Sequence, residues 1–225
     1  MNIRYLGHSA FAIEHDGRTA LIDPFLTGNP KAAVAAGDLD ADAILLTHGH
    51  ADHIGDTVDI AKRTGAHVVA IVEIAGEISA AGVEHVSDPN IGGTVDLGWL
   101  QVRLTPAWHT STTPSGTVNT PAGLVIDAGG TSIYHLGDTA LFSDLALPGR
   151  RAPIDVAIVP IGGHYTMDRH DAVVATELVG APRVIPCHYN TFPPIETDSA
   201  AFKADVEAAG LATVELMAPG DTLEL

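Results

Sequence analysis

The chain has 225 residues, of which 46% are hydrophobic and 17% are charged. This length and composition predict a globular α/β (α+β) protein with one catalytic unit and a large buried core, and they exclude a disordered or fibrous chain. The net charge of -17 repels phosphate backbones and anionic lipid surfaces. We therefore expect a small-molecule substrate, no nucleic-acid partner and no membrane partner.

The N-terminal residues 1–7 show neither the basic stretch nor the long apolar run of an export signal. The single cysteine, Cys187, cannot form an intrachain disulfide, which agrees with a reducing compartment. Both features predict a cytoplasmic protein. Homo-oligomers are common among compact enzymes of this kind, so self-association stays open.

A weak internal repeat organises the chain. In the first half, a hairpin over residues 12–21 precedes a strand over 42–48, a helix over about 52–64 and a strand over 67–71. In the second half, a hairpin over 125–133 precedes a strand over 155–160, a helix over about 168–179 and a strand over 183–187. Gly65 and Gly180 follow the two helices, where a left-handed residue is typical.

The repeat predicts one domain over residues 1–225, with similar half-domains over about 1–110 and 111–225. Two such halves can pack sheet against sheet with their helices outside, as a four-layer αββα sandwich. The alternative is chance similarity between common apolar strands. The positions of the histidines favour the sandwich, because polar strand ends from both halves would then meet at one edge.

The segment His48-Gly49-His50-Ala51-Asp52-His53 begins where an apolar strand ends and finishes where a helix begins. Chance alone would give a His-x-His-x-Asp-His pattern in only about three of a thousand such chains. Gly49 and Ala51 permit a tight turn. His48 and His50 can then face one metal ion, while Asp52 and His53 face a second.

Three more polar residues follow apolar runs and can complete the ligand set: His109, Asp138 and His188. Each residue alone is more often a hydrogen-bonded surface or core group than a ligand. Because the His48–His53 segment already forms a metal-binding pattern, we expect all three residues to be metal ligands. Cys187 precedes one of these residues, and we expect it to be a small buried apolar group.

These motifs resemble those of the metallo-β-lactamase superfamily over the whole chain. Tyr5-Leu6-Gly7-His8-Ser9, Gly137-Asp138-Thr139 and the segments 160–167 and 188–193 are similar to a small bacterial and archaeal branch of metal-dependent hydrolases, related to the ascorbate-6-phosphate lactonases. The resemblance implies that His48, His50 and His109 bind one ion and that Asp52, His53 and His188 bind the other. It further implies that Asp138 bridges the ions, and that Asp23 orients a ligand histidine through its ring N–H.

A dinuclear centre of this kind predicts a hydrolase for a small ester, lactone or phosphoester. Two divalent ions that share a hydroxide lower the pKa of that water and polarise the substrate. Asp52 is the candidate catalytic residue, because it can hold the hydroxide and pass a proton to the leaving group. The ligand set suits zinc, and manganese, iron or nickel accept similar sets.

The remaining histidines and one loop differ in their expected relation to this centre. His8 follows the first strand and His164 follows the strand over 155–160, so both are candidates to contact the substrate or the ligands. The remaining histidines, His15, His67, His85 and His170, fit polar surface positions, and His135 stays unassigned. The hydroxyl-rich loop over 110–121 is either a flap over the substrate or an ordinary exposed loop.

Three alternative functions stay open. The first is phosphodiester or nucleic-acid processing, which the acidic balance and the lack of room for an inserted binding domain disfavour. The second is a di-iron redox centre, which the intact His50 and the lack of a flavin domain disfavour. The third is a metal-binding protein without turnover, against which the full ligand set and Asp52 argue.

Overall fold

The computed structural model describes all 225 residues and contains two seven-stranded sheets. The first sheet contains, in spatial order, β16 (Thr222–Glu224), β1 (Asn2–Gly7), β2 (Ala10–His15), β3 (Arg18–Ile22), β4 (Ala43–Leu45), β5 (His67–Val69) and β6 (Val86–Ser87). The second contains β7 (Thr94–Asp96), β8 (Gln101–Pro106), β11 (Ala122–Ala128), β12 (Thr131–His135), β13 (Val156–Pro160), β14 (Arg183–Cys187) and β15 (Thr213–Val214). A separate hairpin pairs β9 (Ser111–Thr112) with β10 (Val118–Asn119).

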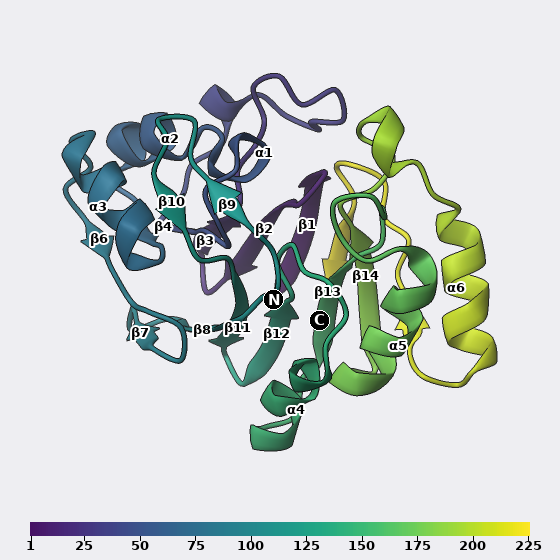
Figure 1. Ribbon diagram of the computed structural model, residues 1–225. Helices are drawn as coiled ribbons and strands as arrows, with labels where there is room; N and C mark the ends of the chain where they lie inside the picture. Colours follow the sequence, from purple (N-terminus) through teal and green to yellow (C-terminus); the bar gives the residue numbers. More distant parts are fainter.

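The helices lie outside the two sheets. Helices α2 (Thr57–Thr64) and α3 (Val72–Ala80) lie on the side of the first sheet, and α5 (Arg169–Val179) and α6 (Ser199–Ala208) on the side of the second (Figure 1). The short helices α1 (Ala51–Ile54) and α4 (Leu147–Arg151) lie at opposite edges of the sandwich (Figure 1). The predicted four-layer αββα sandwich is confirmed. None of these helices is long and apolar enough to cross a membrane.

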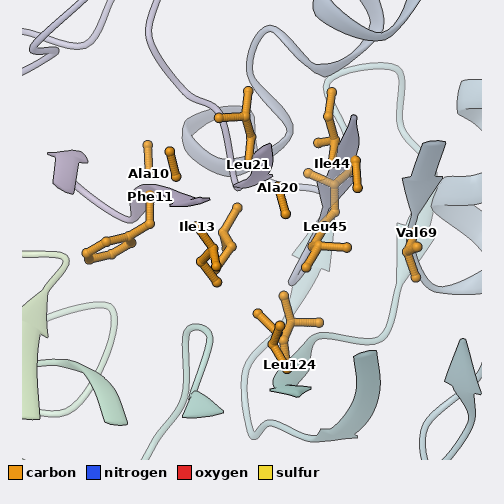
Figure 2. Close-up of a cluster of buried hydrophobic side chains, with 14 of the residues drawn as sticks. Ala10, Phe11, Ile13, Ala20, Leu21, Ile44, Leu45, Val69 and Leu124 are labelled. Atoms are coloured by element: carbon orange, nitrogen blue, oxygen red, sulfur yellow. The ribbon is translucent and has the colours of Figure 1, made fainter. Parts of the chain in front are cut away.

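The core consists of two apolar clusters that meet opposite faces of the second sheet, and the larger one also extends through the first sheet to α2 and α3. Along β13, Val156 and Ile158 belong to the larger cluster between the sheets, whereas Ala157 and Val159 belong to the cluster beneath α5 and α6. This alternation follows from the two-residue period of a strand. Figure 2 shows Leu124 of the second sheet opposite side chains of the first sheet. Both faces of the second sheet are therefore buried, one against the first sheet and the other against α5 and α6.

The two sheets repeat one pattern of neighbours. In each, three antiparallel pairings are followed by three parallel ones, and the hairpins β2–β3 and β11–β12 are the two that the sequence predicts. The sheets do not divide the chain near residue 110, however. Strands β7 and β8 already belong to the second sheet, and β16 returns to pair with β1 in the first. The second sheet is thereby completed by two strands, and the first sheet by one strand, from beyond the expected boundary.

The prediction of one helix over about 52–64 is wrong in one respect, because the segment forms two helices, α1 and α2. Gly55 separates them with φ 38° and ψ -123°, and a Cβ there would lie 2.5 Å from the carbonyl oxygen of Pro24. Asp56 then accepts hydrogen bonds from the backbone N–H groups of Leu26 and Thr27. The break lets the loop after β3 pack against the start of α2. The helix expected over 168–179 is continuous as α5, with Asp168 as its N-cap.

Candidate metal centre

The parallel strands of both sheets end at one edge, and the candidate residues follow those ends. Six non-glycine residues of the chain have positive φ, and four of them are candidates: His8, Asp23, His164 and His188. Left-handed backbone is unfavourable for such residues and is concentrated at functional sites. The backbone N–H of His188 also donates to the carbonyl of His8, which ties the two sheets together at this edge.

One group of ring nitrogens comes from His48, His50 and His109, whose candidate ligand atoms all lie within 4.8 Å of one another. His48 is fully buried, and its Nε2 lies 3.0 Å from Nδ1 of His50. Burial lowers the pKa of His48, so its ring is neutral and has a lone pair to offer. The backbone of Trp108, next to His109, is bonded to Thr139 and Ala140, which holds His109 beside Asp138.

The second group contains Asp52, His53 and His188, together with His8, again within 4.8 Å. Asp52 and His53 lie in α1, and His188 directly follows β14. The ring planes of His53 and His188 are stacked, with centroids 5.6 Å apart. Three of these four side chains are almost completely buried, and that of Asp52 is 32% exposed. Asp52 is therefore the most exposed member of this group.

Asp138 lies between the two groups. Its Oδ2 is 3.1 Å from Nε2 of His188 and 3.3 Å from that of His53, and it is 3.8 Å and 3.9 Å from those of His109 and His48. Burial would raise the pKa of the Asp138 carboxyl, but the surrounding imidazoles outweigh it and lower the pKa. One ionised oxygen thus faces both groups of nitrogens.

Asp23 orients His53. Its Oδ2 accepts a hydrogen bond from Nδ1 of His53 at 2.7 Å, and its carboxylate also accepts from the N–H and hydroxyl of Thr47. The protonated Nδ1 leaves Nε2 of His53 as the free atom, turned towards Asp138. Burial lowers the pKa of His53, but Asp138 and Asp23 outweigh burial and raise it. The surroundings of the His53 ring therefore stabilise positive charge.

Unpartnered polar atoms show that the site fits metal cations. Nε2 of His53 and Oδ1 of Asp138 are buried without a hydrogen-bond partner. Such atoms are costly in a protein interior unless a partner satisfies them. Imidazole nitrogen and carboxylate oxygen are also the donors that zinc and other divalent transition metals accept. The donor set, the burial and the orphaned atoms agree on this fit.

His8 contacts the centre through Asp52. Its Nε2 lies 3.1 Å from Oδ2 of Asp52, and its Nδ1 lies 2.9 Å from the hydroxyl of Thr191. Because a carboxylate only accepts, Nε2–H is the donor and Nδ1 accepts from Thr191. Burial lowers the pKa of His8 to about 4, more than the hydrogen bond to Asp52 raises it. A neutral ring therefore holds one oxygen of Asp52.

His164 is outside both groups. It is exposed, and its ring packs edge-on against Tyr165 with centroids 4.5 Å apart.

The loop over 110–121 folds into the β9–β10 hairpin over the His48–His50 turn. Ser111 and Asn119 accept from the N–H of Gly49. A Cβ on Gly49 would lie 2.6 Å from Thr113, so the turn needs glycine.

Two further groups lie behind the centre. His135 is fully buried in β12, its Nδ1 accepts from the N–H of Gly137, and burial lowers its pKa to about 4. Cys187 is buried, and burial raises the pKa of its thiol well above the ordinary value. It is thus the small buried apolar group that the sequence predicts. Neither side chain lines the open side of the centre.

An open cleft of about 610 Å³ leads to the centre. His50, Asp52, His109, Asp138 and His188 line it. Three aromatic residues that the sequence reasoning missed also line it: Phe25, Tyr165 and Phe192. Each one follows a candidate residue by one to four positions, at Asp23, His164 and His188. Their closeness to strand-end polar residues was the available signal.

Comparison with known proteins identifies the family of the chain. The family model of the beta-lactamase superfamily domain matches residues 2–188. The chain is 47% identical to UPF0173 metal-dependent hydrolases from Methanopyrus kandleri, over 229 residues, and from Shouchella clausii, over 231 residues, with 100% of each chain covered. The structure of Igni18, a metallo hydrolase from Ignicoccus hospitalis, is 41% identical with a TM-score of 0.90, covering 100% of this chain and 98% of that one. The chain belongs to the metallo-β-lactamase superfamily, among the UPF0173 metal-dependent hydrolases.

Proposed function

We propose that this metal-dependent hydrolase uses two divalent ions to hydrolyse a small ester, lactone or phosphoester. His48, His50 and His109 would hold one ion, and Asp52, His53 and His188 the other, with Asp138 shared. The observation that carries the proposal is the position of Asp138 Oδ2, within 3.1–3.9 Å of ring nitrogens from both groups. When bound, two such ions acidify a water to hydroxide and polarise the substrate oxygen.

The chain itself moves the proton through Asp52. His8 donates to Oδ2 of Asp52, which leaves Oδ1 available to a water in the cleft. Burial would raise the pKa of Asp52, but the hydrogen bond from His8 and the nearby imidazoles outweigh it and lower the pKa. The ionised carboxylate can therefore accept a proton from the attacking water and return it to the leaving oxygen. The products are an acid and an alcohol.

The other residues position this machinery. Asp23 fixes the ring of His53, and the β9–β10 hairpin holds the turn that carries His48 and His50. Zinc suits the nitrogen-rich group, and manganese, iron or nickel are alternatives that availability can select. The arrangement requires no second domain, so we further propose that residues 1–225 act as one catalytic domain.

The experiment combines metal content with turnover. Protein reconstituted with zinc or manganese should hold two ions per chain by elemental mass spectrometry and should hydrolyse members of an ester, lactone and phosphodiester panel. Asp52→Ala should abolish that hydrolysis when metal is supplied in excess. Asp171→Ala, which removes an exposed carboxylate of α5, is the matched control and should retain full activity.

Each failure has a distinct meaning. One ion per chain at saturating metal would overturn the dinuclear assignment. Two ions without turnover of any panel member would favour a metal-binding protein that is not an enzyme. A redox centre would instead be revealed by iron that changes its absorption spectrum on reduction, while zinc-loaded protein hydrolyses nothing.

A further inference from the structure

The aromatic wall of the cleft, formed by Phe25, Tyr165 and Phe192, has no task in the hydrolytic machinery. These residues come from three loops that follow β3, β13 and β14. The rings of Phe25 and Phe192 have centroids 6.5 Å apart. Both lie edge-on to the His8 ring, at 6.0 Å and 5.6 Å. The wall therefore begins immediately beside the residue that holds Asp52.

The wall leaves apolar surface in contact with water. Phe25 and Phe192 are half-buried, and Tyr165 is 54% exposed. Exposed apolar surface that is gathered in a concave site marks ligand contact, because a ligand can remove it from water. Aromatic rings gain further from an aromatic partner at these separations. The wall thus fits an apolar group of ring size on the substrate.

The charges of the cleft favour an uncharged substrate. None of the ten residues that line it is lysine or arginine. Several basic residues are instead paired elsewhere, as in Arg63–Asp40 and Arg183–Glu215. The carboxylates of Asp23, Asp52 and Asp138, with a hydroxide, would balance the charge of two divalent ions. A further anionic group on the substrate would therefore find no counter-charge at the wall.

We propose that the aromatic wall binds an uncharged, apolar group of ring size, and that the substrate is a neutral ester or lactone that carries this group. The inference rests on the proposed hydrolytic function and narrows its substrate class. The apolar group lies against Phe25, Tyr165 and Phe192, and the reacting carbonyl points to the floor beside Asp52 and Asp138. Substrates with a charged remote group, such as a phosphorylated sugar, are disfavoured.

Three methyl esters, whose shared leaving group carries no ring, test this selectivity: the acetyl, phenylacetyl and 4-carboxyphenylacetyl esters. We expect kcat/KM of the metal-loaded enzyme to be about tenfold higher for the phenylacetyl ester than for either other ester. Phe192→Ala and Tyr165→Ala should remove most of this advantage, because they should lower kcat/KM for the phenylacetyl ester much more than for the acetyl ester. Leu147→Ala, at an exposed apolar residue of α4 on the opposite edge, is the control.

A variant that adds charge and a binding measurement complete the test. Phe192→Arg should invert the preference between the phenylacetyl and 4-carboxyphenylacetyl esters. Binding of the matching amides, measured by ligand-observed NMR, tests the same selectivity without any turnover. Phenylacetamide should have a lower Kd than acetamide and 4-carboxyphenylacetamide. Because Tyr165 is exposed, its variant remains informative if replacement of a half-buried phenylalanine impairs folding.

The outcomes separate the two proposals. Equal kcat/KM for all three esters, or wall variants that reduce all three equally, would overturn the aromatic-wall inference while the hydrolase proposal stands. Equal Kd values for the three amides would overturn it as well. Loss of two-ion binding together with the absence of any turnover would contradict the proposed function, whereas selective binding of phenylacetamide would still support the wall.

Discussion

The same topological position serves different tasks in the two halves of the sandwich. The loop after β4 and the start of α1 carry His48, His50, Asp52 and His53, which all belong to the candidate ligand groups. The equivalent loop after β13 carries His164, which is exposed, and Tyr165, which lines the cleft. The repeat brings both loops to one edge. What each loop does there depends on its residues, so one half supplies most of the candidate ligands and the other half supplies part of the proposed substrate wall.

The aspartates after β3 and β12 also occupy equivalent positions but differ in their contacts. Replacing them gives the largest expected effect on metal binding and activity. Both oxygens of Asp23 accept hydrogen bonds, from Thr47 and His53, whereas Oδ1 of Asp138 has no partner and its Oδ2 faces both candidate ligand groups. Asp138→Asn should therefore abolish two-ion binding and lower kcat/KM by at least about a thousandfold. Asp23→Asn, which removes only an orienting acceptor, should cost about 10–100-fold in metal affinity.

Metal titration of both variants, followed by elemental analysis and kinetics on the best panel substrate, measures this difference. Circular dichroism of the metal-free proteins is the control for folding. Equal metal affinities in the two variants would contradict the distinction between a shared carboxylate and an orienting one.

The helices after β4 and β13 differ as well, and the difference predicts a stability effect. α5 is continuous, whereas the first-half helix is broken at Gly55, where a Cβ would lie 2.5 Å from the carbonyl oxygen of Pro24. Gly55→Ala should lower the free energy of unfolding by about 3 kcal/mol, through both clash and backbone strain. Gly65 also has positive φ, but its Cβ position is open, so Gly65→Ala should cost only about 1 kcal/mol.

Urea unfolding of both variants, followed by far-UV circular dichroism, provides the comparison. A Gly55→Ala protein as stable as Gly65→Ala would show that the α1–α2 break is not held by the loop that contains Pro24.

The sequence predicted the features that depend on local pattern. Strands such as β13 and β14 were recognisable because both of their faces are apolar, and the His48–His53 motif was recognisable because several metal-binding residue types stand at short spacing. Asp138 and His188 could be placed near that motif because parallel strands end at one edge. The prediction therefore covered the sandwich and the candidate residues that the structure brings together.

The features that it missed depend on contacts between distant segments. Gly55 reads as a tolerated glycine inside a helical pattern, and only its contact with Pro24 shows that the helix must break there. The pairing of β16 with β1 joins the two ends of the chain. Phe25 and Phe192 form one wall only because the loops after β3 and β14 meet in space. No local pattern carries that information.

His8 and His164 give the smallest expected effects and sharpen the comparison between buried and exposed strand-end histidines. His8 donates to Asp52, so His8→Ala should lower kcat about tenfold while two ions remain bound, and His8→Gln, which keeps an N–H donor, should restore part of that loss. His164 contacts the cleft only through Tyr165, so His164→Ala should change kcat/KM by less than about twofold. Kinetics with parallel metal analysis separates these effects, because a ligand role for His8 would remove an ion as well as activity. A tenfold loss in His164→Ala with both ions retained would instead place His164 among the substrate-binding residues and assign the loop after β13 a direct part in catalysis.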